Sequence, residues 1–194
     1  MIAIIDYGAG NVKSVYNALN RLGAESLITS DSEQIKGAHK VIFPGVGHAK
    51  PAMEKLQRSG LDEVIKNLKQ PVLGICLGMQ LMCSHSNEGD VSGLGIFTER
   101  VRKFEGQIKI PHMGWNELID PKGSLFEGIT EGSNVYFVHS YFVEMGSQTS
   151  AKCEYLIPFS ASLRERNFFG VQFHPEKSGE IGSKILSNFL NMNS

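Results

Sequence analysis

Apolar residues in the first half of the chain recur with two alternating periods. Short apolar runs typical of buried strands lie at residues 2–6, 26–29, 40–43 and 71–75. Between them, apolar positions recur every three or four residues, as on one face of a helix, over 12–22, 52–68 and 77–84. Asn11 suits the N-cap of the first helix and Gly23 its C-terminal cap. This alternation predicts an α/β fold with a mainly parallel, flavodoxin-like central sheet flanked by helices.

The second half of the chain has a different pattern. Residues 135–143 form one long β-like run, and residues 160–164 and 168–173 are typical of a hairpin. Apolar positions at helical spacing over 181–190 predict a final helix. We therefore expect an antiparallel extension of the parallel sheet. Without a linker, repeat or low-complexity tract, residues 1–194 are predicted to form a single domain.

Charge and cysteine content narrow the class of protein. The 19 basic and 20 acidic side chains are well mixed and give a net charge of −1, so neither nucleic acid nor an anionic membrane is an expected partner. We find no signal peptide at the start and no apolar stretch long enough to span a bilayer. The three cysteines show no metal-binding spacing. These features predict a cytoplasmic protein with reduced cysteines, no bound metal and no cofactor.

The sharpest chemical signal is Gly74-Ile75-Cys76-Leu77-Gly78, between a predicted strand and a predicted helix. It has the form of a nucleophile elbow, a turn so tight that it needs small residues two positions on either side of the nucleophile. The following helix N-terminus favours a thiolate. The alternative is a buried cysteine in a glycine-rich turn. Cys83 and Cys153 lack this setting, and we interpret them as small core or surface residues.

A thiolate that cleaves an amide also needs a group that protonates the leaving amine. His174 follows an apolar strand in Phe173-His174-Pro175-Glu176, at the sheet edge where parallel sheets place their sites. Because Pro175 fixes the backbone, Glu176 can fold back onto one imidazole nitrogen while the other faces Cys76. The sequence therefore predicts a Cys–His–Glu triad. The alternative is a capped strand end with a chance carboxylate nearby.

The other histidines are weaker candidates for the base. His139 is the main rival, although strand alternation makes it equally suited to a half-buried structural role. The remaining four have no carboxylate pattern nearby, and we interpret them as structural or surface residues: His39, His48, His85 and His112.

Two glycine-rich segments follow predicted strands. In Pro44-Gly45-Val46-Gly47, glycines let backbone N–H groups point into a cleft, so an N–H of Val46 or Gly47 could join that of Leu77 in an oxyanion hole. The alternative is an ordinary turn. Residues 8–10 lack the third glycine of a dinucleotide fingerprint and the Gly-Lys-Ser/Thr of a P-loop, so we interpret them as a plain turn.

Three of these segments together resemble the class I, triad-type glutamine amidotransferase family. They are Pro44-Gly45-Val46-Gly47, Gly74-Ile75-Cys76-Leu77-Gly78-Met79-Gln80 and Phe173-His174-Pro175-Glu176. The resemblance covers essentially the whole chain and implies the fold of that family. It also implies that Cys76 attacks the carboxamide of L-glutamine, with His174 and Glu176 as its catalytic partners.

Within this family, residues 6–11, 111–116 and 136–141 are similar to the glutaminase subunits of imidazole glycerol phosphate synthase. The resemblance implies that Gly45, Gln80, Ser140 and Tyr141 hold glutamine and that Lys177 meets the partner. That partner would be a (βα)8-barrel cyclase on a separate chain, forming a heterodimer. It would use the ammonia to make imidazole glycerol phosphate and aminoimidazole-carboxamide ribonucleotide in L-histidine biosynthesis.

Two alternatives stay open at this stage. The chain could serve a different synthase, for example one that makes anthranilate or pyridoxal phosphate. It could also be a thiol protease or a redox sensor that uses the same elbow cysteine. Glu176 and the segment around Gln80 favour the glutaminase.

Overall fold

Parallel strands form the centre of the molecule. The computed structural model of the chain describes residues 1–106 and 109–192. Its largest sheet has a parallel part in the order β2-β1-β3-β4-β13. These strands are β2 (Ser26–Thr29), β1 (Ile2–Ile5), β3 (Lys40–Gly45), β4 (Val72–Cys76) and β13 (Phe168–Val171).

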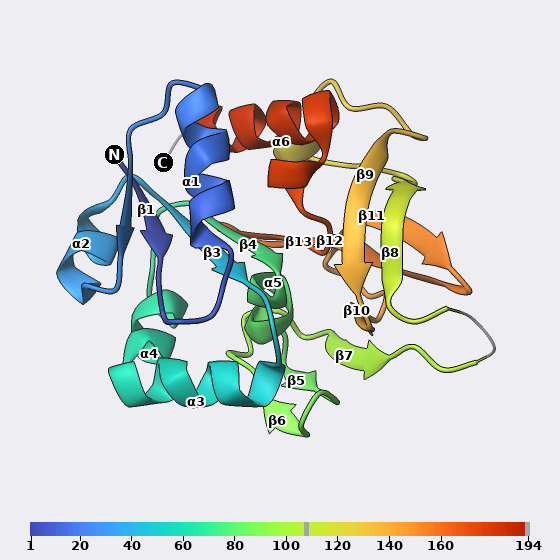
Figure 1. Ribbon diagram of the computed structural model, residues 1–194, viewed down its shortest axis with the longest axis horizontal. Helices are drawn as coiled ribbons and strands as arrows, with labels where there is room; N and C mark the ends of the chain where they lie inside the picture. The colour runs from blue at the N-terminus through green and yellow to red at the C-terminus, as the bar shows by residue number, and fades with distance from the viewer. Residues whose placement is uncertain (107–108, 193–194) are drawn as a thin grey trace.

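Helices cover both faces of this parallel part (Figure 1). One face carries α1 (Val12–Arg21) and α6 (Gly179–Asn191). The other carries α2 (Ser32–Gly37), α3 (Ala49–Ser59), α4 (Leu61–Lys66) and α5 (Leu77–Met82). The strands are apolar on both sides because each side faces a helical layer: in β1, Ile2 and Ile4 join one buried cluster while Ala3 and Ile5 join the other.

The helix ends follow local sequence chemistry. Asn11 caps α1, its side chain accepting a hydrogen bond from the N–H of Ser14 at 3.4 Å, and Gly23 follows the helix with φ +71°. The predicted helical region 52–68 is divided into α3 and α4 at Gly60, which has φ +71°. The short helix α2, which periodicity did not predict, is capped by Asp31. No helix in the described part of the chain is long and apolar enough to cross a membrane.

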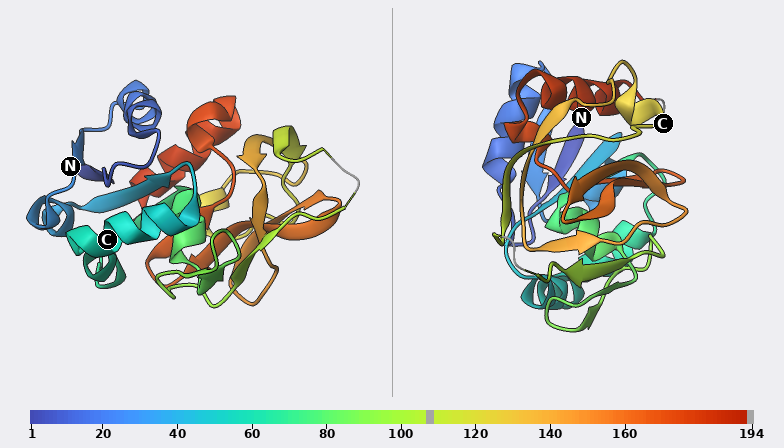
Figure 2. Two further views of the ribbon diagram at one scale, coloured as in Figure 1. Left: turned by 60° about the horizontal axis from the view of Figure 1, so that its bottom comes forward. Right: turned by 90° about the vertical axis from the view of Figure 1, so that its right-hand side faces the viewer.

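The sheet continues past β13 as the predicted antiparallel extension (Figure 2). It runs through β12 (Ile157–Glu165), β10 (Tyr141–Val143), β7 (Arg100–Lys103), β5 (His85–Ser86) and β6 (Val91–Ser92), with β11 (Thr149–Tyr155) paired to β12. The short strand β5 departs from this pattern, because it pairs with β7 in parallel. A separate ribbon pairs β8 (His112–Glu117) with β9 (Asn134–His139). The described residues also include the 3-10 turns η1 (Ser124–Phe126) and η2 (Pro175–Lys177). The predicted fold class is confirmed.

The β-like run predicted over residues 135–143 forms two strands rather than one. The run breaks at Ser140, where the chain leaves the β8–β9 ribbon and enters the main sheet. Strand β9 pairs with β8, whereas β10 pairs with β7 and β12. The sequence is β-like throughout, so only the change of partner separates the two strands.

Candidate active site

The turn after β4 has the geometry of a nucleophile elbow. Cys76 adopts φ +54° and ψ −110°, a conformation that costs a non-glycine residue energy. A side chain at Gly78 would collide with the backbone oxygen of Phe43, and one at Gly74 would lie 2.9 Å from the N of Met79. Both glycines are therefore needed for β3, β4 and α5 to approach closely enough to hold Cys76 in this turn.

The other two cysteines, Cys83 and Cys153, are buried and lie outside the elbow. All three thiols are free, and Cys83 and Cys153 are fully buried. Burial raises the pKa of Cys83 well above its usual value and that of Cys153 to about 12, which keeps both thiols protonated. Across the described ranges, no group of three or more His, Cys, Asp or Glu side chains is placed to hold a metal ion.

His174 and Glu176 lie beside Cys76 because β13 is the parallel neighbour of β4. Val171 pairs with Ile75, so the residues that follow each strand end at the same edge of the sheet. The turn η2 begins at Pro175 and brings Oε1 of Glu176 to 2.8 Å from Nδ1 of His174. Both side chains are buried, and Nε2 of His174 has no hydrogen-bond partner within the described part of the chain.

The surroundings of His174 favour its protonated form. Burial lowers the pKa of this imidazole, but the Cys76 thiol and the Glu176 carboxylate together outweigh burial and raise it to about 10. At neutral pH the ring therefore carries a proton that it can donate.

A cavity of about 230 Å³ opens over this group. It is lined by Val46, Gly47, Cys76, Leu77, Gln80, Glu88, Val138, His139, Ser140, Tyr141, His174 and Lys177. Two residues from the predicted site do not line it. Glu176 lies behind the imidazole, and Gly45 pairs with Cys76 in the register of β3 and β4.

The loop after β3 forms one wall of the cavity. Val46 is 40% exposed, and Gly47 has φ +104°, a conformation that glycine adopts readily. The loop leads into α3, whose first residue, Ala49, donates its N–H to Oε2 of Glu88 at 2.8 Å. Sequence reasoning missed Glu88, since the stretch 87–90 resembles a polar turn and only tertiary contact brings it to the cavity.

Gln80, which lines the cavity, is hydrogen-bonded to a second glutamine side chain that does not line it. Nε2 of Gln80 donates to the Tyr141 carbonyl at 2.9 Å and to Oε1 of Gln172 at 2.8 Å. Gln172, which is fully buried, also has Nε2 3.7 Å from the Cys76 sulfur. Both amide hydrogens of Gln80 are thus used within the protein. Gln172 was also missed, although its place two residues before His174 on the apolar strand was a usable signal.

The remaining histidine predictions have mixed outcomes. His139 is buried rather than half-buried, with Nδ1 2.7 Å from the Tyr141 carbonyl and Nε2 2.9 Å from Nδ1 of His112. Burial lowers its pKa to about 3, so it is a poor base at neutral pH. The expectation that His85 has no carboxylate nearby is wrong, because its Nε2 lies 3.0 Å from Asp90.

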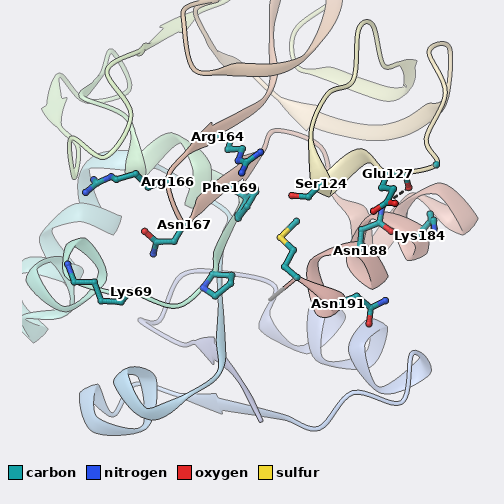
Figure 3. A pocket seen from close by; sticks show the side chains of 13 residues that line it. Lys69, Ser124, Glu127, Arg164, Arg166, Asn167, Phe169, Lys184, Asn188 and Asn191 are labelled. Carbon is teal, nitrogen blue, oxygen red and sulfur yellow. Dashed lines mark hydrogen bonds between the residues drawn. The ribbon is translucent and has the colours of Figure 1, made fainter. Parts of the chain in front are cut away.

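A larger hollow, of about 910 Å³, lies at the opposite edge of the sheet (Figure 3). Pro71, just before β4, and Phe169, near the start of β13, contribute to it, together with Arg164 and Lys184. No cysteine or histidine is among the described residues that line it. Of these two cavities, as far as the described residues show, the smaller one is lined by both a cysteine and a histidine, and it is therefore the candidate active site.

Comparison with known proteins agrees with this geometry. The model of the family "Glutamine amidotransferase class-I" matches residues 3–192, so the chain belongs to the class I glutamine amidotransferases. PurLQS from Thermotoga maritima has a similar fold, with a TM-score of 0.74 at 19% identity over 98% of this chain and 97% of that one.

Curated relatives are similar over their whole length. The chain is 55% identical to imidazole glycerol phosphate synthase subunit HisH of Bacteroides fragilis (strain YCH46), over 98% of this chain and 99% of the relative. It is 47% identical to the subunit of the same name from Archaeoglobus fulgidus, over 99% and 98% of the two chains.

Proposed function

We propose that this chain is the glutaminase subunit of an imidazole glycerol phosphate synthase. It would hydrolyse L-glutamine to glutamate and ammonia and pass the ammonia to a cyclase subunit. The observation that carries the proposal is the placement of Cys76, His174 and Glu176 at two adjacent strand ends beside a cavity. The relatives that share the subunit name over nearly the whole chain support the choice of synthase.

The first half of the reaction releases ammonia. The Cys76 thiolate adds to the carboxamide carbon of glutamine, and the carbonyl oxygen takes up the negative charge. The backbone N–H of Leu77, together with that of Val46 or Gly47, holds this oxyanion. When the C–N bond breaks, Nε2–H of His174 gives its proton to the departing amine. Ammonia and a glutamyl thioester on Cys76 are the products of this step.

The second half of the reaction regenerates the enzyme. His174, now neutral, takes a proton from a water molecule while the water oxygen attacks the thioester carbon. The C–S bond breaks and returns the electron pair to the Cys76 sulfur, releasing glutamate. Glu176 accepts a hydrogen bond from Nδ1–H of His174 throughout, which fixes the ring and stabilises its positive charge.

The cavity also offers groups for the amino-acid end of glutamine. Ser140, Tyr141 and Gln80 line it, and Gly45 lies just before the loop that also lines it. We assign the glutamine ammonium to Glu88, because this is the carboxylate among the cavity-lining residues. Its Oε2 accepts from Ala49, which leaves Oε1 for the ligand.

An exposed apolar surface next to the cavity fits the docking of a partner. Met113 and Trp115 on β8 are 59% and 57% exposed, although such side chains usually avoid water. The Trp115 ring contacts Tyr136, and Nζ of Lys177 lies 5.9 Å from the centre of the Tyr136 ring. We assign this surface to the (βα)8-barrel cyclase of a heterodimer. Direct transfer would protect ammonia from protonation, which destroys its nucleophilicity.

The proposed setting is the cytoplasm, where the three cysteines would stay reduced. All of residues 1–194 would act as one glutaminase domain. The cyclase would combine the ammonia with a phosphorylated ribulosyl aminoimidazole-carboxamide nucleotide. Its products would be imidazole glycerol phosphate, for L-histidine biosynthesis, and aminoimidazole-carboxamide ribonucleotide.

The test is glutamate release by the chain alone, with the cyclase subunit, and with the cyclase and its nucleotide ligand. We expect low activity alone and a large rise with both additions, because the oxyanion loop would complete its site only in the loaded complex. Full activity of the chain alone would contradict this coupling. Absence of turnover under every condition would contradict the glutaminase assignment itself.

A further inference from the structure

We propose that His139 and His112 are positioning residues that hold the glutamine-binding segment Ser140–Tyr141 through a chain of hydrogen bonds with one fixed direction. This inference deepens the proposed function and rests on it. Neither histidine is needed for the triad: from the sequence, His139 was the main rival for the base or a half-buried structural residue, and His112 a structural or surface residue.

The direction of the chain follows from its end point. A carbonyl oxygen can only accept, so the 2.7 Å contact between Nδ1 of His139 and the Tyr141 carbonyl places a hydrogen on Nδ1. In the neutral ring of His139, Nε2 is then an acceptor, and it accepts a hydrogen bond from Nδ1–H of His112 at 2.9 Å. Nε2 of His112 in turn accepts from the side-chain amide of Asn116 at 3.3 Å, and each tautomer is thereby determined.

Both rings are kept neutral and in place by their surroundings. His112 is 3% exposed and lies between the rings of Tyr155 and Phe137, with centroid distances of 4.0 and 4.9 Å. Burial lowers the pKa of His112 to about 4 and that of His139 to about 3. At neutral pH neither ring therefore carries a second N–H, which would point at another hydrogen-bond donor and break the chain.

The Tyr141 carbonyl joins this chain to the catalytic cysteine. It accepts from His139 on one side and from Nε2 of Gln80 on the other, at 2.9 Å. Gln80 also donates to Gln172, which donates to the Cys76 sulfur at 3.7 Å. A continuous polar network thus runs from Asn116 on β8 to the nucleophile, through buried side chains that make few other polar contacts.

Position explains why the segment needs such support. At Ser140 the chain passes from the β8–β9 ribbon to the main sheet. This part of the cavity wall therefore lies between the strand pairing of β9 with β8 and that of β10 with β7. Without the N–H of His139, the Tyr141 carbonyl would keep only the Gln80 bond from this network. We therefore expect weaker glutamine binding, with little change in the chemical step, because the network contacts the binding wall and leaves His174 and Glu176 untouched.

Two variants of one residue separate this role from simple packing. In His139→Asn the amide nitrogen falls near the place of Nδ1 and can still donate to Tyr141, whereas His139→Gln places its amide near Nε2 and loses that donor. With the cyclase and its ligand present, His139→Gln should raise KM for glutamine about three- to tenfold at nearly constant kcat. His139→Asn should keep KM within about twofold of the unmodified chain. Equal KM values for the two variants, or a loss confined to kcat, would overturn the proposal.

Nitrogen-15 NMR of the histidine rings gives a test that needs neither a variant nor turnover. At pH 7 the full-length chain should show His139 and His112 as neutral rings, each with its hydrogen on Nδ1. An Nε2–H tautomer or a charged ring at either position would overturn the proposal, even if a His139 variant failed to fold. Because this signal is independent of glutamate release, failure of the network and failure of the glutaminase assignment can be distinguished.

Discussion

Gly78 allows a direct test of how closely β3 and α5 must approach. A Cβ there would lie 2.9 Å from the carbonyl carbon of Phe43 and still closer to its oxygen, whereas ordinary contact begins at 3.4 Å. The oxygen would lie only 1.9 Å away, so the Gly78→Ala variant must move the helix from the strand by about 1 Å or more. Overpacking of this kind costs about 1–3 kcal/mol of the free energy of unfolding. The displacement also separates Leu77 from the loop at Val46.

Activity should fall further than stability alone explains. Because catalysis depends on sub-ångström placement, we expect kcat for glutamate release to drop about ten- to a hundredfold in folded Gly78→Ala protein. Urea unfolding measures the first effect and a coupled glutamate assay the second. Gly37→Ala in α2 is the matched control, because its added Cβ would meet no other described part of the chain within 4 Å and the change should be neutral or slightly stabilising. A Gly78→Ala enzyme with unchanged stability and kcat would refute the reasoning.

Three further changes test the site. Cys76→Ala should abolish glutamate release without unfolding the chain, and substantial remaining activity would contradict the nucleophile assignment. The pKa of His174 is raised to about 10, so its contribution to stability is complete below its ordinary pKa of 6.5 and is lost as pH rises through 10. Glu176→Gln should shift that loss to lower pH in urea unfolding curves, and identical pH profiles would argue against the ion pair. Glu88→Gln should raise KM for glutamine about tenfold, and an unchanged KM would remove Glu88 from the binding site.

Elements with strong local signals were predictable from sequence. The parallel strands other than the edge strand β2 are short, buried and mainly apolar runs, and α1 has an N-cap, an apolar stripe and a terminal glycine in register. The elbow around Cys76 and the Phe173–Glu176 segment were found because their chemistry depends on neighbours close in sequence. Their juxtaposition followed from the rule that the ends of parallel strands share one edge.

Other features depend on tertiary partners that leave no local pattern. Strand β7 reads Arg100-Val101-Arg102-Lys103 and has one buried residue, so only pairing with β5 and β10 makes it a strand. The two-residue strands β5 and β6 are too short to show any period. Glu88 resembles a turn residue until its contact with Ala49 is known. The burial of His139 could not be predicted, because alternation shows which face of a strand a side chain lies on but not how closely neighbouring side chains pack around it.

The pairing of β13 with β4 also determines when, during synthesis of the chain, the candidate active site is complete. Phe168 meets Val72, half the chain earlier, and β13 lies between β4 and β12 in the finished sheet. During synthesis, β4 stays an edge strand and Cys76 lacks the His174 imidazole until β13 is made and inserted. Under the proposed mechanism, a polypeptide that ends before β13 would therefore hold the thiol but release no ammonia, so glutamine hydrolysis would begin only after the sheet is complete.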